Sequence, residues 1–299
     1  MIVPPVVLDA NVKGATPAPA SIRRLRTSRR FALPLSYLVL AVVSAVVLLP
    51  AWWVLVASFS VGTSAYSSGL WPSPATLANY SQLLAGDFPR WVLNSLIVAI
   101  ATGLVNVTIV ALAAYAFARM RFWGRRVGLI VVFIIQMFPA SMYLVSIYSL
   151  LIKANLEGTL LGLILVYSGA QAFNIWLLTA YIQSVPRDID DAARVDGATR
   201  WSVFWRVVLP LARPMLITLF IWSVLGTYNE FMVASLVLQG SPATYTVAVG
   251  LRNLINNQYA TNWTLFSTGA VLATFPLMVV FLLLQRQLVA GLARGAVSS

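Results

Sequence analysis

The residues best suited to chemistry in this chain are gathered in one stretch, Pro186 to Pro210. That stretch holds four of the eight acidic residues and four arginines: Asp188, Asp190, Asp191, Asp196, Arg187, Arg194, Arg200 and Arg206. Apolar segments lie on both sides of it, and it is the one long polar segment between hydrophobic runs. We therefore expect the rest of the chain to be a membrane scaffold that presents this stretch to a partner.

Common catalytic side chains are missing from the sequence. The absence of cysteine excludes disulfides and thiolate chemistry, and the absence of histidine removes a frequent zinc ligand and the commonest general base. Neither lysine, Lys13 or Lys153, follows a glycine-rich loop of the GxxxxGK[ST] kind. We expect a chain that is not an enzyme and binds no metal or cofactor itself, so that any energy it uses comes from elsewhere.

The first half of the polar stretch has the signals of a short helix. Ser184 and Pro186 mark a start, because proline loses no hydrogen bond at the first helical position. Three aspartates follow in the first turns, where carboxylates complement the positive end of the helix dipole. Gly197 is expected to end this helix, since glycine accepts a left-handed C-terminal conformation without steric cost.

The second half has the signals of another helix. Thr199 is a suitable N-cap, and Pro210 is expected to stop the helix before the next apolar run. Apolar residues recur between them at spacings of three and four: Trp201, Phe204, Trp205 and Val208. The stretch is therefore a helix, a glycine corner and a second helix, and periodicity alone fits an amphipathic loop at the membrane interface equally well.

The residue order favours a more specific interpretation. Asp191-Ala192-Ala193, three residues, Gly197, nine residues and then Val207-Val208-Leu209-Pro210 resemble the EAA loop of ABC-importer permeases. The signature of that family is Glu-Ala-Ala, three residues, Gly, nine residues and Ile-x-Leu-Pro. The resemblance implies that the loop docks to a cytosolic ATPase. The residues that it assigns to this coupling are Asp191, Ala192, Ala193, Asp196, Gly197, Ala198, Trp201 and Phe204. Asp191 is shorter than the usual glutamate, which weakens any contact that needs the longer acid.

Composition and hydropathy identify the chain as an all-α membrane protein. It is 60% hydrophobic and 9% charged, with a mean hydropathy of +0.85, which excludes an ordinary soluble domain. A membrane-spanning helix needs roughly 20 apolar residues. Six runs qualify, at 31–59, 91–118, 127–152, 159–184, 212–236 and 265–287. We expect a six-helix transmembrane domain over residues 31–290, a disordered basic cytosolic tail over residues 1–30 and a C-terminal cytosolic tail over residues 291–299.

The distribution of positive charge predicts the orientation. All but three of the twenty lysines and arginines fall on one side of these six helices. The exceptions are Arg90, Lys153 and Arg252. Because basic residues favour the cytosolic side, both termini and residues 186–210 are expected in the cytosol. The resemblance to ABC-importer permeases implies the plasma (inner) membrane of a bacterium or archaeon.

The resemblance extends over roughly residues 31–297. It is carried by Leu77-Ala-Asn-Tyr80, Asn94-Ser95, Tyr115–Phe122 with Gly124, Gln136-Met-Phe-Pro-Ala140, Tyr245–Leu251 and Gly291–Val297. These segments are similar to those of binding-protein-dependent carbohydrate permeases of the maltose/maltodextrin type. The resemblance implies a type I permease fold, a second permease subunit, a dimeric cytosolic ATPase that binds ATP and magnesium, and an extracytoplasmic sugar-binding protein. Ser298-Ser299 replace the usual Lys-Gly ending, which puts a tail contact through that lysine in doubt.

A few polar residues lie within the expected spans, and they are candidates for the solute pathway. Glu230 is the sole acid there, and an ionised group in that position has to face the bundle interior, pair or stay protonated. The pathway hypothesis covers Tyr228, Asn229, Glu230, Gln136, Asn174 and, similarly, Gln171. The alternative is an inter-helix hydrogen bond or a gate contact.

Two other functional classes are compatible with an apolar chain of this kind. A self-sufficient secondary carrier would be expected to show inverted half-repeats, and none are evident. A membrane anchor or receptor would need no polar residues of the pathway kind. Within the favoured class, the cargo is maltose or maltodextrin, with trehalose and other oligosaccharides as alternatives.

Overall fold

The computed structural model describes residues 21–64, 71–139, 142–169, 171–256 and 261–296. These residues form helices and one isolated bridge between Ser60 and Ala75, with no strand among them. In chain order the helices are α1 (Ser21–Ser58), α2 (Ala78–Ala85), α3 (Phe88–Arg119), α4 (Arg125–Gln136), α5 (Leu144–Lys153), α6 (Leu160–Tyr167), α7 (Ala172–Ser184), α8 (Asp188–Val195), α9 (Arg200–Val203), the π-helical segment η3 (Phe204–Val208), α10 (Leu209–Asn229), α11 (Met232–Val237), the 3₁₀ segment η4 (Pro242–Thr244), α12 (Val247–Ile255) and α13 (Trp263–Ala296).

The chain divides into two compact units within α1, one ending at Trp52 and the other beginning at Trp53. The first unit is the greater part of α1. This helix begins at Ser21 and not at Phe31, so residues 21–30 are helical where an unstructured tail was expected. No proline or glycine interrupts residues 21–30, and leucine and arginine are good helix formers, which explains the earlier start. The part of α1 from Ser36 to Ser58 is long and apolar enough to cross a membrane.

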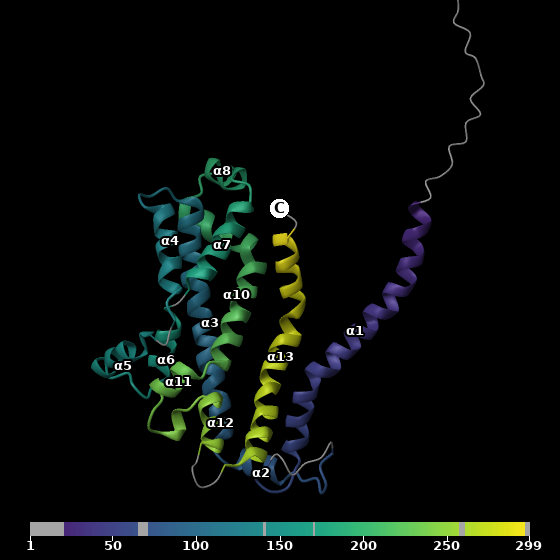
Figure 1. Cartoon of the computed structure of the whole chain (residues 1–299). Coiled ribbons are helices and arrows are strands. Elements are labelled where there is room, and N and C mark those ends of the chain that lie inside the picture. Colours follow the sequence, from purple (N-terminus) through teal and green to yellow (C-terminus); the bar gives the residue numbers. More distant parts are fainter. Residues whose placement is uncertain (1–20, 65–70, 140–141, 170, 257–260, 297–299) are drawn as a thin grey trace, which may run out of the picture. The chain divides into compact units, whose positions relative to one another are not determined.

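Three long helices, α3, α10 and α13, form the frame of the second unit, and α3 lies directly against α10 (Figure 1). Gly103 permits the close approach of these two, because a Cβ at that position would lie 2.9 Å from the ring of Phe220. Asn106 Nδ2 in α3 also donates a hydrogen bond to Ser223 Oγ in α10, at 2.9 Å. Close packing at Gly103 and the hydrogen bond between Asn106 and Ser223 therefore join the two helices.

Several of the expected runs are interrupted. The run 127–152 is divided between α4 and α5, and 159–184 between α6 and α7, which are bent by 51°. Pro139 and Gly169, next to these two breaks, disfavour a continuous helix. By length and composition, four described helices can cross a membrane alone, or five spans if α6 and α7 count as one. The run 127–152, expected as one helix, is therefore two helices in the structure, while the all-α fold of apolar helices is confirmed.

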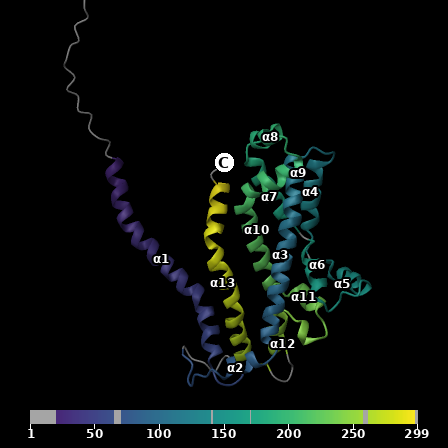
Figure 2. The same ribbon diagram turned by 180° about the vertical axis from the view of Figure 1, so that it is seen from behind.

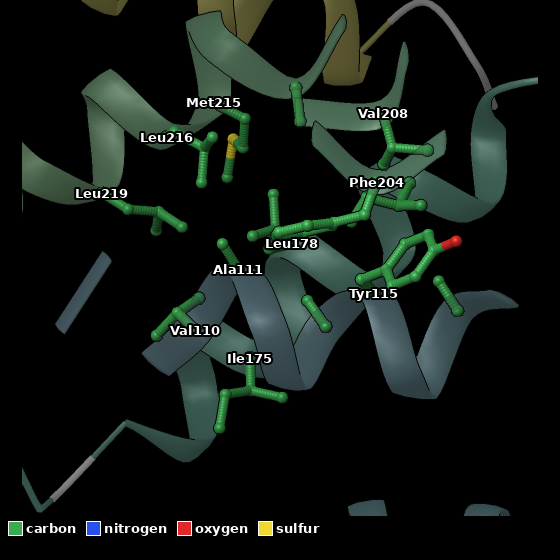
Figure 3. Packing of buried hydrophobic residues seen from close by; sticks show 14 of the residues in the cluster. Val110, Ala111, Tyr115, Ile175, Leu178, Phe204, Val208, Met215, Leu216 and Leu219 are labelled. Carbon is green, nitrogen blue, oxygen red and sulfur yellow. The ribbon is translucent and has the colours of Figure 1, made fainter. Parts of the chain in front are cut away.

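Helix α8 lies at one end of α3 and α10, while α2 and α12 lie at the opposite end (Figures 1 and 2). A buried cluster near α8 joins α3, α7, η3 and α10. Figure 3 shows Phe204 and Tyr115 in this cluster together with Leu178 and Val208. The segment that connects α7 to α10 is thus built on a packed apolar base.

Candidate functional site

The polar stretch forms the helix–corner–helix that its sequence predicts, with α8 as the first helix. Helix α8 begins at Asp188, two residues after Pro186, and carries Asp188, Asp190 and Asp191 in its first turn. Gly197 has φ +84°, a left-handed conformation that a residue with a Cβ adopts only at a cost. The corner therefore depends on the glycine backbone.

The second helix is capped as predicted but does not end where expected. Thr199 Oγ1 accepts a hydrogen bond from the amide of Ser202 at 3.2 Å. Pro210 was expected to stop the helix, and this prediction was wrong, since helical structure continues from α9 through η3 into α10. Proline supplies no amide hydrogen, and the π segment Phe204–Val208 lies directly before α10, where the hydrogen-bonding pattern adjusts to that loss.

The aromatic residues of the second helix are divided between the interior and the surface. Phe204 is only 2% exposed, and its ring centroid lies 5.0 Å from that of Tyr115 in α3 (Figure 3). Trp201 and Trp205 are 60% and 49% exposed. Phe204 was therefore wrong as a residue that touches a partner, because a side chain in the core of its own chain is not available for docking.

The remaining residues expected to couple to a partner are mostly on the surface. Asp191, Ala192, Asp196 and Gly197 are exposed. Ala193 and Ala198 are partly buried against the cluster around Phe204, so their small side chains allow the loop to lie close to its base. Val195 is 89% exposed and adds an apolar side chain to the outer face of α8.

A buried ion pair ties the loop to the end of α3. Arg119 Nε lies 2.7 Å from Asp190 Oδ2, and both side chains are 3% exposed. The Nε–H is not aligned as a hydrogen bond to that oxygen, and Asp190 Oδ1 has no hydrogen-bond partner among the described residues. Removing one partner of such a pair leaves a buried charge uncompensated. The sequence showed Asp190 only as one of several charges on α8, and nothing in its spacing indicated a partner 71 positions away.

Next to this pair is a cavity of about 340 Å³ lined by five arginines and two aspartates. Its lining includes Arg119, Arg121, Arg187, Arg194, Arg200, Asp190 and Asp191. On the surface nearby, Arg194 Nη1 lies 3.2 Å from Asp191 Oδ1, and both side chains are well exposed. This exposed pair adds little to stability, so the carboxylate of Asp191 is free to exchange partners.

Glu230, the acid within the expected span, acts as a helix cap. Its Oε1 accepts from the amide of Val233 at 2.9 Å, and its Oε2 accepts from the amide of Ala234 at 3.1 Å. The hydroxyl of Tyr167 in α6 donates a further hydrogen bond to Oε2. These contacts satisfy backbone amides at the start of α11 that have no partner within the helix, and they join α6 to the break between α10 and α11. The geometry favours the structural alternative for this residue over solute contact.

Two neighbours of Glu230 also have structural partners. Tyr228 is 3% exposed, and its hydroxyl donates to the carbonyl of Ala273 in α13 at 3.0 Å. The amide nitrogen of Asn229 donates to the carbonyl of Leu225 at 2.8 Å. Burial of the Tyr228 ring is incompatible with stacking on a sugar, whereas Asn229 is exposed and remains available.

The other pathway candidates meet where α4 and α7 come together. Gln136 Oε1 accepts from the amide of Phe173 at 2.9 Å, and Asn174 Nδ2 donates to Gln171 Oε1 at 2.8 Å. Gln136 and Gln171 line a cavity of about 350 Å³ with Tyr143 and apolar residues from α3, α4, α5 and α6. The structure thus brings Gln136, Gln171 and Asn174 together, and it leaves Glu230 outside the lining of that cavity.

Comparison with known proteins gives the family. Residues 107–294 match the family described as binding-protein-dependent transport system inner membrane component. The chain belongs to this family. It is therefore a permease subunit of an ABC importer, and ATP hydrolysis is performed by a separate subunit. The helices described above place this permease in the membrane as a multi-pass protein.

Similar permeases are named as transporters of oligosaccharides. A galactooligosaccharides transport system permease protein, GanQ of Bacillus subtilis, is 33% identical over 91% of this chain and 97% of its own length. The maltodextrin transport system permease protein MdxG of the same organism is 36% identical over 87% of this chain and 94% of its own. The maltose/maltodextrin permease protein MalG of Photorhabdus laumondii is 40% identical over 69% of this chain and 71% of its own.

Solved structures of ABC importers share the fold. One chain from a bacterial transporter that imports the acidic polysaccharide alginate aligns with a TM-score of 0.75 and 23% identity, over 91% of this chain and 99% of its own length. A chain of the MetNI methionine transporter aligns with a TM-score of 0.52 over 68% of this chain and 95% of its own. The type I permease fold inferred from the loop is confirmed.

Proposed function

We propose that this permease forms half of the translocation pathway for a neutral oligosaccharide, with maltose or maltodextrin as the cargo. Relatives named for maltodextrin and galactooligosaccharide transport support the class, and the 36% identical maltodextrin permease supports the cargo. The observation that carries the coupling part of the proposal is the exposed helix–corner–helix at 186–210, built on a buried apolar base.

The surface offered to the ATPase combines apolar and charged groups. Trp201 and Trp205 stand exposed on the second helix, and Val195 on the first. Exposed aromatic side chains of this kind are frequent anchors in protein interfaces. Asp191 is free to exchange its surface partner Arg194 for a basic residue of the ATPase, so Trp201 and Asp191 together set the register of docking.

The assembly that we infer has two permease subunits, a dimeric ATPase and an extracytoplasmic sugar-binding protein. The membrane is the bacterial or archaeal plasma membrane, with both termini and residues 186–210 in the cytosol, where ATP is available. ATP and magnesium bind at the ATPase. Closure of its dimer moves the loop and rocks the attached helices between inward-open and outward-open states.

Within the membrane, solute contact is assigned to the cavity at the junction of α4 and α7. Its amide groups, Gln136 and Gln171, offer both donors and acceptors to sugar hydroxyls, and Tyr143 offers an apolar ring. Asn174 holds Gln171 in place through the 2.8 Å hydrogen bond. Broken helices at the level of the bilayer are common where solutes pass, because they expose polar backbone to a cavity.

The test is purification of the tagged chain from native membranes in mild detergent, followed by identification of all chains that accompany it. Recovery of a second permease and an ATPase, with ATP-dependent uptake of labelled maltodextrin after reconstitution, is the expected result. Uptake of trehalose in place of maltodextrin would refute the proposed cargo, while the assignment to sugar importers would still hold. Recovery of this chain alone, active in liposomes with an ion gradient, would overturn the class.

A further inference from the structure

Helix α3 differs from its neighbours in being continuous from one end of the second unit to the other. It runs for 32 residues with its single proline in the first turn, where proline is tolerated. Around it, α4 and α5 are separate, α6 and α7 are bent by 51°, and α10 ends at Asn229 before α11 begins. A long unbroken helix transmits displacement with less deformation than helices with breaks.

The end of α3 beside α8 is bound to the polar loop through several independent contacts. Arg119 forms the buried 2.7 Å ion pair with Asp190 and also donates from Nη2 to the carbonyl of Val185 at 3.0 Å. Arg187 Nη2 donates in the opposite direction, to the carbonyl of Ala118 at 3.3 Å. These contacts lie on both sides of the start of α8, so α8 cannot rotate away from α3 without breaking them.

The second helix of the loop is bound to the same end of α3. The hydroxyl of Tyr115 donates to the carbonyl of Arg200 at 3.0 Å, and its ring packs on Phe204 (Figure 3). Both α8 and α9 are therefore attached to the last turns of α3, in addition to their covalent connection to α7 and α10.

The opposite end of α3 is bound to the segment before α12. Trp91 Nε1 donates to the carbonyl of Pro242 at 2.9 Å, and Asn94 Nδ2 donates to the carbonyls of Ala243 and Tyr245 at 2.9 and 3.0 Å. The amide of Val247 donates to Ser95 Oγ at 2.7 Å. Four hydrogen bonds therefore hold the start of α12 on the first turns of α3.

From these contacts we propose that α3 is the rod that carries movement of the ATPase-docking loop across the membrane to α12 and its preceding segment. The inference rests on the proposed function, since it takes the loop as the point where the ATPase acts. Arg119 and Asp190 are its positioning residues at the loop, and Asn94 is its positioning residue at the far end.

Helix α10 is the competing route, because it is covalently continuous with the loop. It begins after a π segment, contains Pro214 and ends at Asn229, so displacement along it meets three places where helical geometry changes. A buried ion pair and hydrogen bonds at one end and four hydrogen bonds at the other make α3 the stiffer connection.

Charge exchange tests the end of α3 at the loop, in the complete importer reconstituted with its ATPase and binding protein. We expect Asp190→Asn to reduce binding-protein-stimulated ATP hydrolysis by about tenfold, within the usual range of coupling effects, while the ATPase stays bound. The double exchange Arg119→Asp with Asp190→Arg is expected to restore most of the stimulation. Asp188→Asn, on the exposed start of the same helix, is the matched control. Stimulation equal to wild type in Asp190→Asn would overturn the proposal.

The far end is tested by the ratio of solute transported to ATP hydrolysed. Asn94→Ala removes two hydrogen bonds to the segment before α12. We expect the loop to move as before, while α12 is displaced less than in the wild type. We expect hydrolysis to continue while uptake per ATP falls by about fivefold. A proportional fall of uptake and hydrolysis would contradict transmission through this end.

Crosslinking tests the rod in a complex that has already assembled. Met120, directly after α3, and Arg194, in α8, line the same cavity. The natural chain has no cysteine, so Met120→Cys with Arg194→Cys creates a unique pair. If α3 and the loop move as one body, a short bifunctional maleimide will leave uptake at the level of the uncrosslinked variant, with each single-cysteine variant as control. An assembled, transporting complex that crosslinking stops would overturn the inference and leave the proposed function intact. Purification of this chain without any bound ATPase would overturn both the inference about α3 and the proposed function.

Discussion

The end of α3 at the loop and the broken helices beside α3 satisfy their polar groups in different ways. At the loop, a charged pair is buried beside a cavity lined mostly by charged residues, and the aromatic and aliphatic side chains of α3, α7, η3 and α10 form a packed apolar cluster. Along α4 to α7 and at the start of α11, polar side chains instead cap backbone groups that the helix breaks leave free. The difference separates a rigid coupling end from a membrane region in which helix ends are stabilised locally and cavities can form.

The largest effect is expected from the corner of the loop. Gly197→Val forces a β-branched residue into φ +84°, a conformation that costs an ordinary residue about 1–2 kcal/mol and a β-branched one more. No atom lies within 4 Å of the added Cβ, so the strain is in the backbone alone. We expect transport to be abolished with normal expression, measured by uptake and by immunoblot of membranes.

A glycine elsewhere supplies the control for that substitution. Gly124 precedes α4 with φ +78°, and a Cβ added there would likewise meet no atom within 4 Å. Gly124→Val imposes similar strain outside the loop and is expected to keep most of the transport. Transport at the wild-type rate in Gly197→Val would contradict the coupling role of the corner.

The next largest effect is expected at the start of α11. Glu230→Ala removes two backbone caps and the bond to Tyr167, and an unsatisfied buried group costs about 1–3 kcal/mol. We therefore expect a lower thermal unfolding temperature of the purified complex. Glu157→Ala, at an exposed acid, is expected to leave that temperature unchanged. Unchanged stability in Glu230→Ala, together with an altered cargo preference, would contradict the capping role and support solute contact by Glu230.

A smaller effect is expected from the exposed aromatic surface of the loop. Trp201→Ala removes a 60% exposed ring that we assign to docking, so ATPase affinity is expected to fall by about tenfold or more, as for other interface anchors. Trp123→Ala, at a fully exposed tryptophan outside the loop, is the matched control. Quantitative pull-down of the ATPase with each variant measures the difference, and equal retention in both would exclude Trp201 from the interface.

The smallest effect is expected from the surface ion pair. Arg194→Ala breaks the 3.2 Å contact with Asp191, in which the two side chains are 41% and 64% exposed. Exposed pairs contribute less than about 1 kcal/mol, so thermal stability should change little. A loss of stability as large as that of Glu230→Ala would mean that this pair is part of the packed base.

Much of the loop could be predicted from sequence because its signals are local. Gly197 in a left-handed conformation and Thr199 as an N-cap follow from the preferences of single residues. The burial of Phe204 and the partner of Asp190 depend on α3, which is distant in sequence. Continuation through Pro210 was missed because a π segment can accommodate proline in a way that residue types do not indicate.

The membrane-spanning part of the chain was less predictable, because the positions of helix breaks also depend on contacts that the residue types do not indicate. Hydropathy locates apolar runs but says little about where a run is interrupted. Pro139 suggests a kink in the run 127–152, yet the separation of that run into α4 and α5 was not predicted. Glu230 was recognised as unusual, yet its role as a cap depends on a break after Asn229 that the apolar pattern conceals. The departure at Ser298-Ser299 lies outside the described residues.

The most direct test of the central claim is uptake of labelled maltodextrin by proteoliposomes that contain the purified complex, with binding protein outside and ATP inside. We predict uptake that requires both the binding protein and ATP and is lost in Gly197→Val. Uptake that proceeds without ATP, driven by an ion gradient through this chain alone, would contradict the account.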